Sequence, residues 1–67
     1  MKYSMADLHR LFPLGHIVIN LGCIKAYIDG YKEHPDGSCD LVLREIVGGQ
    51  RKRQKFTGDP DKCVLVN

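Results

Sequence analysis

Hydrophobic and polar positions change their period once along the chain, near residue 16. Within residues 4–12, apolar side chains recur at spacings of three and four, which is typical of one face of a helix. Ser4 can serve as the N-cap, and Asp7 stands three positions later as the acidic partner of a capping box. The pattern therefore predicts a helix of about two turns, which Pro13 ends.

After residue 16 the chain has the pattern of short strands separated by turns. Segments of alternating apolar and polar side chains, rich in β-branched residues, are divided by breaks at Gly, Pro and Asp. The predicted strands cover residues 16–21, 23–31, 39–47, 51–57 and 63–66. In the second strand, Lys25, Tyr27 and Asp29 should share the face opposite to the apolar one.

Five short strands in a chain of this size must curl to bury one face, so the sequence predicts a mostly-β fold in a single domain, residues 1–67. The pattern over residues 16–66 resembles small five-stranded SH3-like barrels in three respects: a long second strand, a tight hairpin between strands three and four, and a turn with Pro and Asp before a brief last strand. In such a barrel, the short N-terminal helix could plug one open end. The OB-fold is the nearest rival, but it usually has a longer chain and a helix between strands three and four.

Composition narrows the class of protein. A hydrophobic fraction of 43% and a charged fraction of 27% are ordinary for a globular domain. A chain of 67 residues buries a small core, so a partner would add stability. No apolar run approaches the roughly 18 residues that span a bilayer, and the first ten residues lack the apolar core of a signal peptide. We therefore expect a cytoplasmic protein without a membrane partner.

The cysteines and histidines do not form a recognisable site. Cys23, Cys39 and Cys63 contain no Cys-x-x-Cys pair, so a zinc site that used His34 with two of them has little support. We expect three reduced thiols that pack as small hydrophobic groups. The histidines are scattered, and the sequence identifies neither an oxyanion hole nor a third orienting group. The sequence thus predicts no metal, no cofactor and no enzymatic activity.

A basic run follows the Gly-Gly pair at 48–49. Four of the five residues from 51 to 55 are cationic, and neither face of this strand is apolar until Phe56. A central strand would bury these charges, which costs several kcal/mol for each unpaired ion. The run therefore belongs at a sheet edge or in an arm, where lysines also protect against aggregation.

The same run could bind phosphates, because arginine presents a planar fork that matches phosphate oxygens. Small barrels also use aromatic side chains to stack bases. The leading hypothesis is accordingly a non-enzymatic module that contacts the backbone of RNA or DNA. Its candidate residues are Arg51, Lys52, Arg53, Lys55, Lys25 and Tyr27.

The alternative is a protein-interaction module, such as an accessory or inhibitor subunit. The strand 39–47 is apolar on both faces, while a barrel strand needs only one apolar face. Val42 and Ile46 could therefore contact a protein partner or a second copy in a homodimer. We expect, however, that the N-terminal helix covers this second face.

Overall fold

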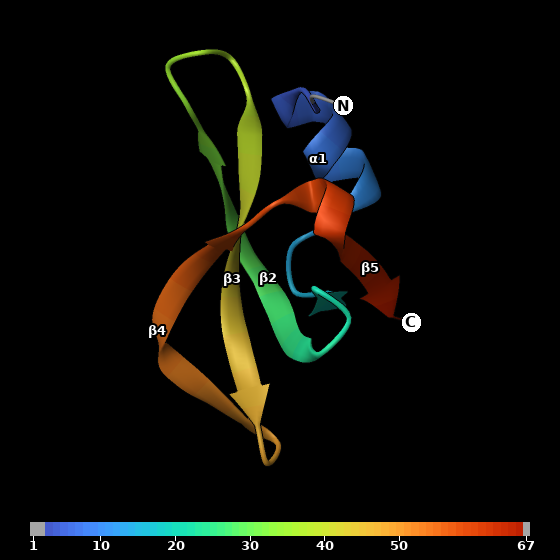
Figure 1. Cartoon of the computed structure of the whole chain (residues 1–67), viewed down its shortest axis with the longest axis vertical. Coiled ribbons are helices and arrows are strands. Elements are labelled where there is room, and N and C mark those ends of the chain that lie inside the picture. Colours follow the sequence, from blue (N-terminus) through green and yellow to red (C-terminus); the bar gives the residue numbers. More distant parts are fainter. Residues whose placement is uncertain (1–2, 67) are drawn as a thin grey trace.

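The computed structural model describes the backbone of residues 3–66 and the side chains of residues 3–50 and 54–66. Within these described residues, one helix and five strands follow one another, with one 3-10 turn before the last strand (Figure 1). Their bounds are α1 Met5–Leu11, β1 Ile17–Asn20, β2 Ile24–Glu33, β3 Cys39–Val47, β4 Gln50–Gly58, η1 Pro60–Lys62 and β5 Cys63–Val66. The elements predicted from the sequence are confirmed, with β2 two residues longer at its end than expected.

The strands form one antiparallel sheet in the order β4-β3-β2-β1-β5. Within the described part of the chain no ladder joins β4 to β5, so these two strands are the edges of an open sheet. The expectation of a closed barrel is therefore wrong, while the mostly-β fold with a short helix is confirmed. The predicted edge position of the basic strand is also confirmed, because it is β4.

Local hydrogen bonds set the start of α1. Ser4 Oγ accepts from the Asp7 backbone N–H at 3.1 Å, and the Ser4 backbone N–H donates to Asp7 Oδ2 at 3.3 Å. The predicted capping box is thus present, and it satisfies two N–H groups that a helix start leaves without partners. Because two turns are too short to be stable alone, the helix depends on packing.

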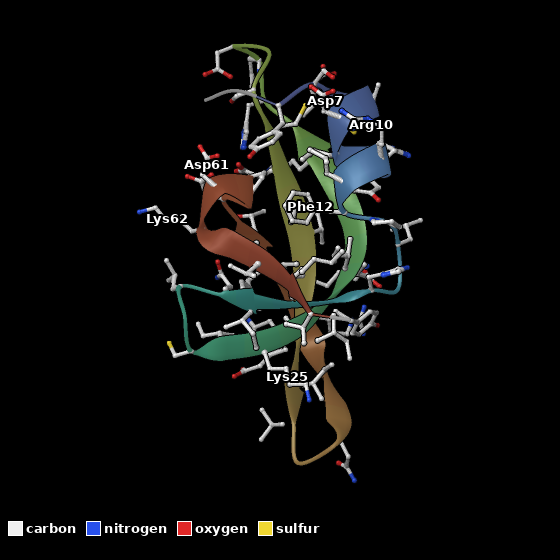
Figure 2. The ribbon with its side chains drawn as sticks, turned by 90° about the vertical axis from the view of Figure 1, so that its right-hand side faces the viewer. Asp7, Arg10, Phe12, Lys25, Asp61 and Lys62 are labelled. Atoms are coloured by element: carbon white, nitrogen blue, oxygen red, sulfur yellow. The ribbon has the colours of Figure 1, made fainter. Side chains whose placement is uncertain are left out.

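The helix packs on one face of the sheet, which we call the inner face. Leu8 and Phe12 are buried there together with residues of all but one of the strands (Figure 2). The Tyr31 hydroxyl donates to the Phe12 carbonyl, and the His9 ring stacks on Tyr31 at a centroid distance of 4.2 Å. The core consists of Leu8, Phe12, Val18, Ala26, Ile28, Cys39, Leu41, Leu43 and Cys63.

This packing gives the physical reason for the open sheet. In a closed barrel, the far strands cover the inner face, whereas here α1 supplies much of that apolar cover. The helix lies on the side of Leu41 and Leu43, which alternates with the side of Val42 and Ile46. The expectation that the helix covers Val42 and Ile46 is therefore wrong.

The cysteines divide between the core and the surface. Cys39 and Cys63 are buried, as small hydrophobic residues should be, whereas Cys23 is exposed in the turn between β1 and β2. Burial raises the pKa of the Cys63 thiol to about 11. The Cys63 thiol also donates to the Asn20 amide oxygen at 3.5 Å. All three thiols are free, but the expectation that all three pack as small hydrophobic groups is wrong for the exposed Cys23.

Candidate functional site

The sheet face opposite to α1, which we call the outer face, carries the predicted aromatic residue and two of the predicted cations. Paired residues in an antiparallel ladder point to the same side of the sheet. The register places Tyr27 opposite Arg44, and Arg44 opposite Lys55. One row on this face thus runs across β5, β1, β2, β3 and β4 through Val66, Ile17, Tyr27, Arg44 and Lys55.

A second row begins on the same face. Val64 pairs with Ile19, and Ile19 pairs with Lys25. Both rows change character in the same direction, because β5 and β1 supply apolar side chains while β2, β3 and β4 supply an aromatic ring and cations. The outer face therefore has an apolar half and a basic, aromatic half.

Asp29 partly neutralises the basic half. Its Oδ2 lies 2.8 Å from Lys55 Nζ and 3.6 Å from an Arg44 guanidinium nitrogen. The hydrogen bond from Lys55 is the main reason that the pKa of Asp29 is lowered, and the charges of Lys55 and Arg44 act in the same direction against burial. Asp29 is thus ionised near neutral pH and competes with any anionic ligand for these two cations.

Arg44 lies at the centre of the basic half, between Tyr27 and Lys55. Its Nε is buried, and no hydrogen-bond partner is found for it among the described residues. Because this Nε is enclosed, only the exposed part of the guanidinium can donate to an incoming acceptor, such as a phosphate oxygen, and the Arg44 side chain is 23% exposed. Arg44 was not among the predicted site residues. The signal was present in the sequence, since Arg44 alternates with Val42 and interrupts the second apolar face of that strand.

The structure places the predicted residues as follows. Lys25 and Lys55 are exposed and Tyr27 is half-buried, all on the outer face. The backbone of residues 51–53 belongs to β4, with Arg51 opposite Ile46, while the side chains of Arg51, Lys52 and Arg53 lie outside the described residues. The structure therefore brings Lys25, Tyr27 and Lys55 onto one surface, and the backbone of the remaining three continues along its edge.

The residues of the alternative interface lie on the same strand as Arg44. Val42 stands opposite Gly30 on one side and Thr57 on the other. Both Val42 and Ile46 are half-buried rather than exposed. They therefore offer less free apolar surface than the residues of β5, among which Val64 is 68% exposed.

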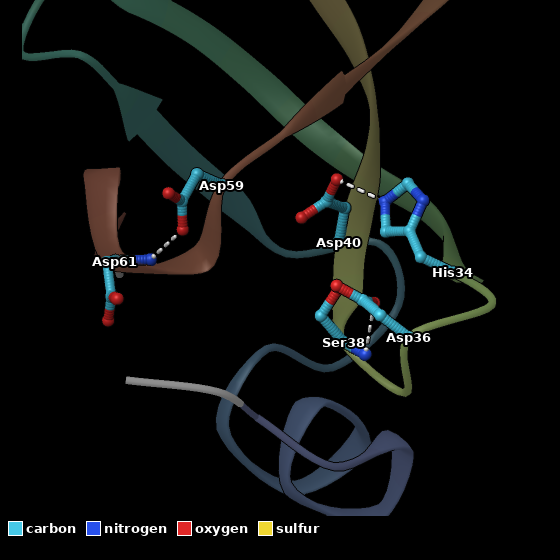
Figure 3. Close-up of polar contacts among 6 residues, drawn as sticks. All are labelled: His34, Asp36, Ser38, Asp40, Asp59 and Asp61. Atoms are coloured by element: carbon cyan, nitrogen blue, oxygen red, sulfur yellow. Dashed lines mark hydrogen bonds and ion pairs between the residues drawn. The ribbon is translucent and has the colours of Figure 1, made fainter.

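A separate cavity of about 320 Å³ lies at the other end of the sheet, next to η1. The cavity is acidic because Asp40, Asp59 and Asp61 line it. Figure 3 shows two of the contacts of these aspartates: Asp40 Oδ2 lies 2.7 Å from His34 Nε2, and Asp59 accepts from the Asp61 backbone N–H at 3.0 Å. The hydrogen bond with Tyr3 is the main cause of the lowered pKa of Asp61. Such a cavity repels phosphates, and no metal-binding group of three or more His, Cys, Asp or Glu residues occurs in the described part of the chain.

Two further findings bear on identity. Within the described residues, no helix has the length and apolar character needed to cross a bilayer. Comparison of the chain with protein-family profiles, curated proteins and solved structures finds no match.

Proposed function

We propose that this protein is a non-enzymatic binding module that contacts the backbone of RNA or DNA through the basic half of its outer face. The observation that carries the proposal is the adjacent placement of Tyr27, Arg44 and Lys55 in one row across three strands. Lys25 lies in the neighbouring row, and Arg51, Lys52 and Arg53 extend the cationic sequence along β4.

The chemistry of these groups supports a nucleic-acid ligand. Arginine and lysine side chains neutralise phosphates and release the counterions bound to them, which drives association at low salt. A tyrosine ring between cations can stack a base, which is worth about 1–3 kcal/mol. α1 leaves this face free, because it packs on the inner face.

A protein partner is the second candidate function. Arginine and tyrosine are also enriched at protein interfaces, and Val42 and Ile46 adjoin the basic half of the outer face on β3. We rank this candidate lower because both apolar side chains are half-buried, whereas Lys25 and Lys55 of the leading candidate are exposed. If a protein partner binds this surface, Val42→Asp or Ile46→Asp should abolish the binding. The binding should also depend little on salt.

We also propose that the fold is related to SH3-like barrels. The support is the long β2, the tight β3–β4 hairpin and the Pro60-containing turn before a short β5. In addition, the chain order returns the last strand to the first one. Small sheets of this type commonly bind ligands on a curved, exposed face.

The test is fluorescence anisotropy with mixed-sequence RNA and DNA across a salt series. We expect micromolar binding whose log–log salt slope falls by about one unit for each phosphate contact removed. Arg51→Glu/Arg53→Glu and, separately, Arg44→Gln should flatten this slope. Tyr27→Leu should weaken binding roughly tenfold at an unchanged slope, because it removes stacking and no charge.

The matched control is Lys62→Glu, which reverses an exposed charge on η1 away from the outer face. Lys62→Glu should weaken nucleic-acid binding much less than Arg51→Glu/Arg53→Glu does. If wild-type protein does not bind at low salt, or if Lys62→Glu and the outer-face variants weaken binding equally, the proposal is wrong. The search should then turn to a protein partner.

A further inference from the structure

The two edges of the sheet differ in chemistry. β4 carries the cations Arg51, Lys52, Arg53 and Lys55, which protect an edge from pairing with another strand. β5, with the sequence Cys-Val-Leu-Val, has no charged residue and no proline. Natural proteins protect sheet edges with charges, with proline or by keeping the edge strand short, and β5 has only the last of these devices, because it is four residues long.

The backbone of β5 offers free hydrogen-bonding groups at Leu65. In an antiparallel ladder, residues that exchange backbone hydrogen bonds with the partner strand alternate with residues whose N–H and C=O point away from it. The Leu21 N–H donates to the Lys62 carbonyl at 2.9 Å, which identifies this pair as hydrogen-bonded. The two kinds of pair alternate along the ladder, so the pair of Leu65 and Val18 is a non-hydrogen-bonded one. The N–H and C=O of Leu65 therefore point away from β1, to the open edge.

The side chains of β5 are also unusually exposed. Val64 is 68% and Val66 is 42% exposed, and both lie on the outer face beside Ile19 and Ile17. Even Leu65, on the inner side, is 38% exposed. The open edge is thus bordered by apolar side chains on both faces of the sheet, which is the composition of a strand in the middle of a sheet.

We propose that β5 pairs with β5 of a second copy of this chain, antiparallel and centred on Leu65. The Leu65 N–H of each copy would donate to the Leu65 carbonyl of the other, and the two sheets would continue as one. A two-fold axis through this pair keeps both outer faces on the same side, so Val64 and Val66 of the two copies form one apolar strip.

The distribution of charge favours pairing between two copies of this chain through β5 rather than through β4. A two-fold contact brings the same surface of both copies together, so any charge at its centre faces a like charge. Self-pairing of β4 would oppose cations, whereas self-pairing of β5 opposes no charged residues. A chain of 67 residues with a small core also gains stability from association.

The strength of the contact follows from its size. A stable interface buries about 800 Å² on each partner, and a strand of four residues contributes only part of that. We therefore expect a dimer whose population depends on concentration in the micromolar range, and not a permanent assembly.

The experiment is sedimentation equilibrium of the full chain without nucleic acid, so its result does not depend on the proposed function. The mass should rise from 7.6 kDa toward twice that value with concentration. Val64→Lys, which sets two like charges beside the axis, should weaken the dimer at least tenfold. Leu65→Pro removes the N–H at the open edge, where proline is tolerated, and should do the same.

Two control variants isolate the cause. Leu14→Lys places the same charge at an apolar residue that is 59% exposed but lies in the α1–β1 connection, and it should leave the dimer intact. Leu65→Ala truncates the same side chain but keeps the N–H, so it should associate more strongly than Leu65→Pro. Circular dichroism shows whether each variant is folded. If Leu65→Pro is unfolded, the result for Val64→Lys alone decides the test. A wild type that stays at 7.6 kDa at millimolar concentration, or a dimer that survives both β5 variants, overturns the proposal.

Discussion

Lys55 Nζ lies 2.8 Å from Asp29 Oδ2, an ion pair that joins the edge strand β4 to β2 across β3. Arg44 of the intervening strand approaches the same carboxylate at 3.6 Å. Asp29→Asn should therefore release two cations on the outer face. We expect nucleic-acid affinity to rise several-fold at low salt, with a salt slope steeper by up to about two units, one for each released cation, as measured by fluorescence anisotropy.

Glu33→Gln is the matched control for this change, since it removes one negative charge at an exposed position near the end of β2. An equal gain in both variants would show that net charge alone governs binding. An Asp29→Asn protein with unchanged affinity would argue against the involvement of Arg44 and Lys55.

The capping box makes the helix sensitive to a single oxygen atom. Ser4→Ala removes the acceptor of the Asp7 N–H and should lower the free energy of unfolding by about 1 kcal/mol. Ser4→Asp keeps an acceptor at the N-cap and should cost much less. Urea denaturation followed by circular dichroism measures both variants, and similar losses would contradict the role of the cap.

Asp7 adds a pH dependence to the same feature. Its pKa is lowered, first by the backbone hydrogen bond from Ser4 and then by the Ser4 side chain. A carboxyl group with a lowered pKa stabilises the fold above its ordinary value of 3.8, and this stabilisation is lost as the pH falls through the folded pKa. Asp7→Asn should therefore be less stable than wild type at pH 7, with a difference that shrinks below about pH 4. A constant difference down to pH 2 would contradict this mechanism.

Gly58 packs closely against the side chain of the buried Leu43. A Cβ atom at Gly58 would lie 2.6 Å from Leu43 Cδ1, and Leu43 is completely buried, so it has little room to move. Gly58→Ala should cost about 1–3 kcal/mol through overpacking. Gly30→Ala is the matched control, because its Cβ would meet Val42 at an ordinary 3.8 Å. Thermal unfolding should separate the two variants, and equal melting temperatures would refute the steric explanation.

Leu21 adopts a left-handed backbone conformation, with φ of 55°, in the turn between β1 and β2. A branched side chain is disfavoured there by about 1–2 kcal/mol, whereas asparagine tolerates it. Leu21→Asn should therefore raise the melting temperature by several degrees. Leu14→Asn makes the same change at an equally exposed leucine outside the left-handed region, and it should show no such gain.

Local features of this fold were predictable from the sequence. The capping box, the break between the strands predicted at 16–21 and 23–31, and the alternation along β2 depend on residues within a few positions of one another. The edge position of β4 followed from a general argument, since its charges have no place inside a sheet. These predictions succeeded because each one is decided by short-range chemistry.

Features that depend on distant parts of the chain were not predictable in the same way. Closure of the sheet depends on whether β4 or α1 covers the inner face, and the docking of Leu8 and Phe12 decides this. The row that joins Tyr27, Arg44 and Lys55 depends on register shifts in the ladders on both sides of β3. Alternation within one strand identifies a face, but it does not align three strands.

The pairing of β1 with β5 sets an order of events in folding. β2, β3 and β4 are joined by short turns, so their ladders close small loops, whereas Val18 must find Leu65 across most of the chain. Non-local pairings form slowly because the entropy of loop closure must be overcome before any contact offsets it. We therefore expect the β2–β3–β4 meander to appear first and β5 to dock last and detach first. In amide hydrogen exchange, the β1–β5 ladder should be the least protected ladder of the sheet.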